Sequence, residues 1–110
     1  MATVFKHAVN TDVGTTPIDV IQITPGVSAT VIGLNLSNKT DFDVVSVDVQ
    51  IVDASSTVGF YVRKMAIPPK TTVKVVTQGE KLILPANTGL RLVSDLDSSI
   101  DSTISFVEIS

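Results

Sequence analysis

The chain has 110 residues, carries a formal net charge of −3 and contains no cysteine. This length suits one domain with a core of its own, and the missing cysteine excludes disulfides and cysteine-ligated zinc or iron–sulfur sites. The eight Lys and Arg residues are scattered along the chain, so the sequence predicts no basic surface for nucleic acid.

Short segments of alternating apolar and polar residues run along the whole chain. Val, Ile and Thr make up roughly two-fifths of it, and these branched residues favour strands over helices. No segment of ten residues shows a helical apolar stripe. We therefore expect about eight short strands, in a pair within 29–53 and in segments 18–23, 60–67, 71–78, 81–84, 90–94 and 103–109, with residues 3–13 as a further strand or an extended arm.

The opening segment, residues 3–13, is predicted to be a strand or an extended arm. Its two faces are Val4, Lys6 and Ala8 on one side, and Phe5, His7 and Val9 on the other. Residues 1–12 as an extended arm would suit contact with a neighbouring molecule, because a strand-like arm can add to an exposed sheet edge.

The longest alternating stretch is residues 29–53, in which a polar connection separates two apolar segments. In the second segment Val45, Val47, Val49 and Ile51 share one face. The first segment is expected to place one set of residues on one side and a second set on the other: Ile32, Leu34 and Leu36, against Val31, Gly33 and Asn35. We interpret this stretch as an antiparallel pair at the centre of the fold.

Turn-forming residues separate the predicted strands. Thr24-Pro25-Gly26 and Gly79-Glu80 suit turns, and Pro68-Pro69 must end a strand because neither proline can donate to a ladder. Turn signals every eight to twelve residues are typical of a sandwich or barrel. The predicted fold is an all-β antiparallel β-sandwich, jelly-roll or immunoglobulin-like, formed by residues 1–110 as a single domain.

Residues with catalytic or metal-binding chemistry are few. His7 is the only histidine, and nothing in the sequence selects a nucleophile or an orienting partner for it. There is no nucleophile elbow, phosphate loop or dinucleotide motif, so we expect no enzyme and no cofactor. Asp95, Asp97 and Asp101 resemble the start of a calcium loop, but Ile100 replaces the turn glycine and Phe106 the final Glu. A solvated loop is the favoured interpretation of the three carboxylates.

Candidate contact residues come from two predicted strands, residues 60–67 and residues 3–13. Tyr61, Arg63 and Met65 share a face in the alternation of residues 60–67, either as a contact patch or as a plain sheet surface. Val4, Phe5 and His7 are the corresponding candidates in the opening segment. The four phenylalanines are expected to be core or interface anchors: Phe5, Phe42, Phe60 and Phe106.

The amino-terminal sequence MATVFKHAVN does not have the charge and apolar pattern of a signal peptide. No apolar run approaches the ~20 residues that cross a bilayer. We therefore expect a soluble protein that is made in the cytoplasm and has no membrane partner.

Several stretches together resemble a known family: TVIGLNLSNKT, the Val-rich strand after it, MAIPPKTTVKVV, GEKLILPANTGLRLVS and the terminal SFVEI. They are similar to small structural proteins of tailed bacteriophages, especially those of cyanobacteria and marine bacteria. The resemblance covers about residues 25–110. It implies a virion component with a β-sandwich fold and carries over no catalytic or ligand residues.

The resemblance and the lack of catalytic motifs together favour a phage structural protein. The expected role is a capsid decoration or cement protein that binds the major capsid protein or other virion proteins and stabilises the shell. We expect a homo-oligomer, with a trimer favoured, located in the virion and assembled in the host cytoplasm. A tail, neck or fibre component, and a calcium- or carbohydrate-binding module, are the alternatives.

Overall fold

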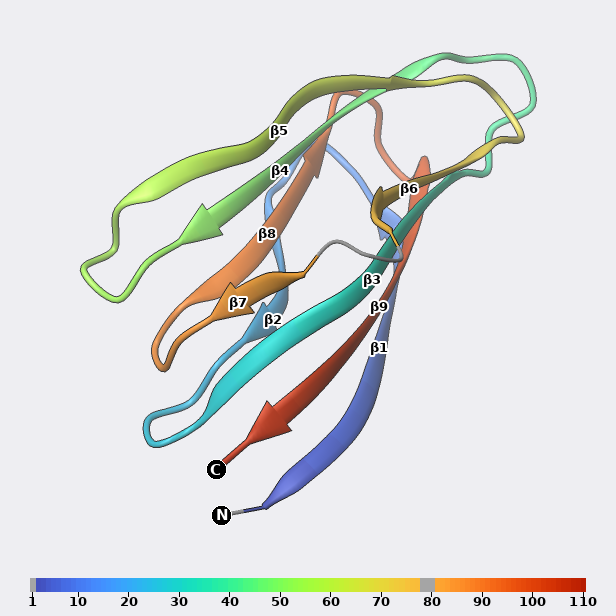
Figure 1. Ribbon diagram of the computed structural model, residues 1–110. Helices are drawn as coiled ribbons and strands as arrows, with labels where there is room; N and C mark the ends of the chain where they lie inside the picture. Colours follow the sequence, from blue (N-terminus) through green and yellow to red (C-terminus); the bar gives the residue numbers. More distant parts are fainter. Residues whose placement is uncertain (1, 78–80) are drawn as a thin grey trace.

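The computed structural model describes residues 2–77 and 81–110, and within these residues it contains strands and no helix (Figure 1). The turn expected at Gly79-Glu80 lies outside the described residues. The strands are β1 (Thr3–Val13), β2 (Ile18–Gln22), β3 (Ser28–Asn38), β4 (Val45–Val52), β5 (Val58–Ile67), β6 (Thr72–Val76), β7 (Leu82–Leu84), β8 (Gly89–Ser94) and β9 (Ile100–Ile109).

The strands form two antiparallel sheets that pack face to face. Sheet A has the order β1-β9-β3-β6, with β7 also paired to β3, and sheet B has the order β2-β8-β4-β5. The predicted antiparallel β-sandwich is confirmed. The molecule measures 47 × 27 × 21 Å along its principal axes, and both chain ends lie at the same end of it (Figure 1).

The strand pairs are nested, and this nesting decides between the two predicted types of sandwich. The pairs are β4 with β5, β3 with β6 and β7, β2 with β8, and β1 with β9. The chain is thus one long hairpin, rolled so that successive pairs join alternate sheets. This arrangement is a jelly roll.

The tip of the rolled hairpin is a turn held by one carboxylate. Oδ1 of Asp53 accepts hydrogen bonds from the backbone N–H groups of Ser55 and Thr57, at 3.0 and 2.9 Å. It also accepts one from the Ser55 hydroxyl at 2.8 Å. These bonds lower the pKa of Asp53, the Ser55 hydroxyl most strongly. A short Asp- and Ser-rich turn therefore closes the innermost pair.

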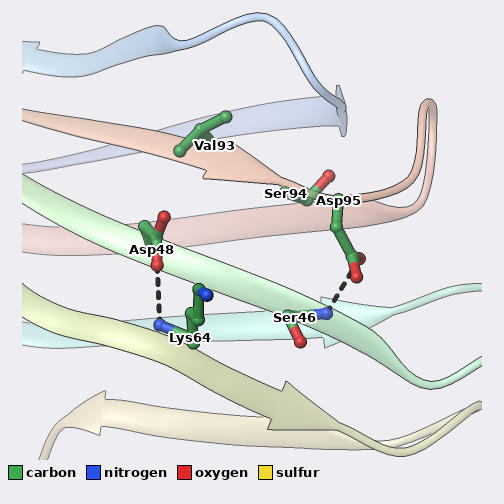
Figure 2. A pocket seen from close by; sticks show the side chains of 6 residues that line it. All are labelled: Ser46, Asp48, Lys64, Val93, Ser94 and Asp95. Atoms are coloured by element: carbon green, nitrogen blue, oxygen red, sulfur yellow. Dashed lines mark hydrogen bonds between the residues drawn. The ribbon is translucent and has the colours of Figure 1, made fainter.

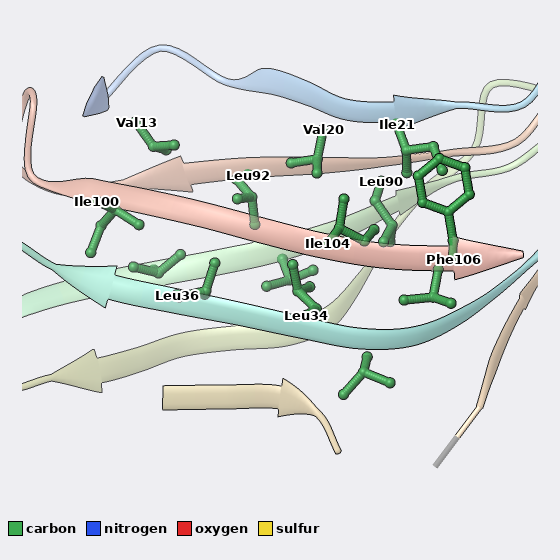
Figure 3. Close-up of a cluster of buried hydrophobic side chains, with 14 of the residues drawn as sticks. Val13, Val20, Ile21, Leu34, Leu36, Leu90, Leu92, Ile100, Ile104 and Phe106 are labelled. Carbon is green, nitrogen blue, oxygen red and sulfur yellow. The ribbon is translucent and has the colours of Figure 1, made fainter. Parts of the chain in front are cut away.

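Apolar side chains from both sheets fill the space between them (Figure 3). Leu34, Ile104 and Leu92 are fully buried, and the predicted inward face of β4 is confirmed by the burial of Val45, Val47 and Val49. Phe106 is the phenylalanine that belongs to the core. The other three are exposed and can serve as anchors only by contact with another molecule: Phe5, Phe42 and Phe60.

The prediction that residues 29–53 form a central strand pair is wrong. β3 lies in sheet A and β4 in sheet B, and neither pairs with the other. The polar connection at 39–44 crosses from one sheet to the other. Asn38 anchors that crossing: its side-chain amide donates to the carbonyl oxygens of Asp43 and Ile67, at 2.8 and 2.9 Å.

The predicted faces of β3 are also partly wrong, because the strand contains a bulge. The pairing of β3 with β9 shifts between Val31 and Gly33. One extra residue reverses the side to which all later side chains point. Val31 is therefore buried together with Leu34 and Leu36, whereas Ile32 is exposed.

Residues 3–13 form the edge strand of sheet A. β1 pairs with β9 without interruption from Thr3 to Asn10. The two chain ends are tied together, since Ala2 and Ser110 exchange backbone hydrogen bonds at 2.8 and 2.9 Å. The sequence predicted either a strand or an extended arm for this segment, and within the chain it forms a strand.

None of the described residues belongs to a helix that is long and apolar enough to span a membrane.

Candidate functional site

The outer face of sheet A carries a row of side chains that crosses four strands. In the strand register Phe5 of β1 lies opposite Val107 of β9, Val107 lies opposite Thr30 of β3, and Thr30 lies opposite Ile83 of β7. Directly opposed residues point to the same side of a sheet. Phe5 is 80% exposed and Ile83 is 68% exposed, so both point to solvent. We call these four residues, of which three are apolar and Thr30 is polar, the apolar row.

Further apolar side chains extend this row along the same face. Ile109 lies two residues beyond Val107 on β9, and Val9 lies four residues beyond Phe5 on β1. The β3 bulge adds Ile32. All three are exposed, and the charged residues of this face, Lys74 and Asp101, stand opposite the far part of β3. The strand pairing therefore places apolar side chains, and no charged ones, on this half of the face; exposed Lys81 lies at its edge, just before β7.

The outer face of sheet B is charged. Asp19 of β2 lies opposite Arg91 of β8, and their side chains form an ion pair at 3.2 Å. Phe60 is exposed on β5, but the guanidinium of Arg63 lies 5.0 Å from its ring centroid. The two outer faces thus differ in chemistry, and the face of sheet A is the better candidate for contact with protein.

An open depression of about 340 Å³ lies on sheet B (Figure 2). Two of its carboxylates are engaged by backbone groups. Asp48 accepts the N–H of Lys64 at 2.6 Å, and Asp95 accepts the N–H of Ser46 at 2.9 Å. The bond from Lys64 lies at a bulge in β5, where Lys64 has a φ of 52°. These contacts give both carboxylates a structural role.

The residues predicted to form a contact patch on residues 60–67 do not share one exposed face. Two register shifts interrupt the pairing of β5 with β4, and each shift changes the side to which the side chains point. Tyr61 and Met65 are half-buried against the core, whereas Arg63 is exposed. The alternation in the sequence could not show this.

The residues predicted for contact on residues 3–13 are placed in sheet A, away from those of β5 in sheet B. Phe5 and His7 point to the outer face, and Val4 lies on the other side of β1, opposite Glu108. Ile83, Ile32 and Val107 were missed. Ile83 had one available signal. In the strand predicted at 81–84, Ile83 must point away from Leu82 and Leu84, and so toward the outer face if the two leucines are buried.

The three aspartates of the possible calcium loop turn to different partners. Asp97 accepts hydrogen bonds from the backbone N–H and the hydroxyl of Thr15, at 3.0 and 2.8 Å. These bonds lower its pKa, the backbone bond most strongly. Asp101 accepts the backbone N–H of Asp12 and forms an ion pair with Lys39 at 3.1 Å. Asp95 is bound to β4.

Within residues 2–77 and 81–110, no three His, Asp or Glu side chains come together as a metal site. The ammonium group of Lys39 stands between the carboxylates of Asp12 and Asp101, which also raise the pKa of Lys39, the Asp12 hydrogen bond most strongly. A protein cation therefore occupies the position beside Asp101.

Comparison with known proteins shows likeness in structure alone. No protein-family profile and no curated protein matches the sequence. A chain from the Bacillus endospore appendages, a family of disulfide-linked pili, superimposes with a TM-score of 0.58 at 6% identity, over 98% of this chain and 88% of that one. A chain of the T=1 particles derived from infectious bursal virus superimposes with a TM-score of 0.56 at 12% identity. The shared feature is the fold.

The two neighbours differ from this chain in ways that limit the likeness. The match covers 97% of this chain but 30% of the viral one, so the chain spans about a third of that protein's length. The disulfide linkage named for the pili has no counterpart here, because this chain has no cysteine. Copies of this chain therefore cannot be linked to one another by disulfides.

Proposed function

We propose that this protein is a structural subunit of an assembled particle and that it docks on other proteins through the outer face of sheet A. The observation that carries the proposal is the apolar row, which places exposed Phe5 and Ile83 on one face of the sheet. Solvent-exposed apolar faces of this kind favour protein partners. The protein acts by binding and catalyses no reaction.

The size of this face suits a stable contact. The two longer dimensions of the molecule, 47 Å and 27 Å, bound a sheet face at about 1,270 Å². A standard protein interface buries about 800 Å² on each partner. The face as a whole is therefore large enough for a specific complex, and many copies on one particle reinforce one another through multivalency.

The particle is proposed to be the capsid of a tailed bacteriophage. This step is supported by the resemblance of residues 25–110 to phage structural proteins. It is also supported by the fold shared with chains from two assemblies, spore appendages and virus-derived particles. As a decoration or cement protein, the chain binds the assembled shell and not its separated subunits, and it stabilises the shell by mass action. Its location is the outer surface of the virion.

The first experiment locates the protein on particles and counts it. Antibody labelling of purified virions and quantitative mass spectrometry are expected to place it on the capsid in hundreds of copies. A count of about six to twelve would instead assign it to the tail or neck, where the symmetry offers few equivalent positions. Absence from particles would reject the proposal.

The second experiment tests the docking face with matched variants. Ile83→Lys puts a charge into the apolar row, and Val58→Lys puts the same charge on the outer face of sheet B, where Val58 is also exposed. Both should fold normally. The binding is measured on particles from which the native protein has been removed. Ile83→Lys should reduce the amount bound to them at least about tenfold, and Val58→Lys should bind as the wild type does. Equal binding by both variants would show that sheet A is not the docking face.

A further inference from the structure

The two sheets end in edge strands, and three of these edges are interrupted. β5 contains two register shifts and the charged pair Arg63 and Lys64. β2 has five residues and a shift after Asp19. Along β3 the edge is shared by β6 and β7, of five and three residues. Short, bulged and charged edges resist pairing with another chain.

The β1 edge is different in the described part of the chain. Eight consecutive residues, Thr3 to Asn10, pair with β9 in unbroken register, and the irregularity comes only after Asn10. Thr3 to His7 are all exposed, and no described element pairs with the other side of the strand. β1 is thus a long, regular strand with a free side.

The backbone groups on this free side can be identified. Ala2 exchanges hydrogen bonds with Ser110, and in an antiparallel ladder alternate residues point to the same neighbour. The even-numbered residues of β1 therefore bond to β9. The odd-numbered residues direct their N–H and C=O groups away from the sheet: Thr3, Phe5, His7 and Val9. The side chains of these same residues lie on the outer face.

We propose that the free edge of β1 pairs with β1 of a second copy of this chain, antiparallel and about a two-fold axis. Each copy would supply the same strand, as a closed two-fold dimer requires. The pairing would satisfy the outward N–H and C=O groups of both strands and would join the two copies of sheet A into one continuous sheet.

Charge and apolar contacts select the register, with His7 of one copy opposite His7 of the other. This register places Phe5 opposite Val9 of the second copy, an aromatic and β-branched pair that stabilises adjacent strands. It also places Lys6 opposite Ala8. Moving the two-fold axis by one residue, from His7 to Lys6, would put Lys6 opposite Lys6, and directly opposed like charges are destabilising. Moving the axis the other way, to Ala8, would bring the irregular segment at Asp12 into the paired strands.

The one charge on this part of β1 does not prevent the pairing. The ammonium group of Lys6 is 2.7 Å from the carboxylate of Glu108 on β9, so it points back to its own sheet. Lys6 also belongs to the face opposite to the apolar row, because it lies across from buried Phe106. The dimer would therefore present two apolar rows side by side.

A pair of proline and alanine variants tests the proposal on the purified protein. The N–H of His7 points outward, so His7→Pro removes a donor needed by the second copy and none that β9 uses. His7→Ala keeps that donor. Sedimentation equilibrium should give twice the 11.6 kDa chain mass for the wild type and for His7→Ala. For His7→Pro the dimer dissociation constant should rise about tenfold or more, with an unchanged circular dichroism spectrum.

Single cysteines test the register, since the chain has no other thiol. With His7 on the axis, two His7 Cα atoms lie about 5.5 Å apart, within the range of a disulfide. Two Phe5 residues are then about 14 Å apart along the strands. His7→Cys should form a covalent dimer in mild oxidant and Phe5→Cys should not. Faster crosslinking of Phe5→Cys would overturn this register.

A monomer, or a trimer in which His7→Cys does not crosslink, would overturn the pairing altogether. The trimer was the expectation from sequence, so the mass and the crosslink together separate the two arrangements. The pairing does not depend on the proposed function. Dimerisation is measured on the isolated protein and docking on particles, so either can fail while the other holds.

Discussion

Replacement of Asn38 by alanine should destabilise the fold strongly. Asn38 is 2% exposed, and its side chain makes four hydrogen bonds. Its amide donates to the carbonyl oxygens of Asp43 and Ile67, and its Oδ1 accepts from the backbone N–H and the hydroxyl of Thr40, at 2.9 and 2.7 Å. These bonds hold the connection that crosses between the sheets.

The size of the effect follows from those contacts. An intramolecular hydrogen bond contributes about 0.5–1.5 kcal/mol net, and a buried group left unpaired costs about 1–3 kcal/mol. Ile67 is fully buried, so in Asn38→Ala its carbonyl oxygen loses a partner that water cannot easily replace. We expect the free energy of unfolding to fall by about 3 kcal/mol, which lowers the melting temperature by about 12 °C for a domain of this size.

Urea unfolding followed by circular dichroism measures this loss, with Asn35→Ala as the matched control. Asn35 is on the same strand but points to the half-exposed outer face, opposite Thr103. Substitutions at such sites usually change stability by less than about 0.5 kcal/mol. If Asn38→Ala loses less than about 1 kcal/mol, or no more than Asn35→Ala, the crossing is not held by this side chain.

Three further predictions concern the carboxylates and the edge strand. The hydrogen bonds from Thr15 lower the folded-state pKa of Asp97. The stabilising contribution of Asp97 is therefore present above the ordinary carboxyl pKa and is lost as the pH falls through the lower folded value. Urea midpoints measured between pH 5 and pH 2 should decline less in Asp97→Asn than in the wild type. Millimolar calcium should leave the melting temperature unchanged, because Lys39 already neutralises Asp101; a rise that disappears in Asp97→Ala would restore the calcium-module hypothesis. Deletion of residues 2–10 should cause unfolding or aggregation rather than a folded protein that lacks only an arm, because it removes eight register pairs with β9; a soluble truncated protein with a native circular dichroism spectrum would contradict this.

The individual strands were predictable from sequence, because alternation and turn residues are local properties. The segment predicted at 3–13 is β1, with the same bounds, and the segment at 18–23 is β2 within a residue. Burial of alternate valines in β4 followed from the same period of two. Local patterns of this kind fix which residues extend and where the chain turns.

The pairing of those strands could not be predicted in this way. A polar connection such as 39–44 can close a hairpin within one sheet or cross to a second sheet about 10 Å away, and alternation is the same in both cases. The choice depends on contacts distant in sequence, such as the bond from Asn38 to Ile67. Bulges were equally invisible, because the extra residue at Ile32 looks like any other apolar position in the strand.

The candidate docking face shows why sites of this type are hard to find in a sequence. Phe5 and Val107 lie at opposite ends of the chain and become neighbours because the nested hairpin pairs β1 with β9. Ile83 joins them only through the pairing of β7 with β3. Each residue alone is an ordinary apolar position in an alternating strand. Once the nesting of a jelly roll is assumed, however, the outermost pair must contain the two chain ends, and the outward side chains of both ends must share one face. The same nesting leaves the first strand at a sheet edge, where its free side can meet a second copy. Docking face and pairing edge are thus two consequences of one topology, and they are expected to lie side by side wherever the outer residues of the first and last strands are apolar.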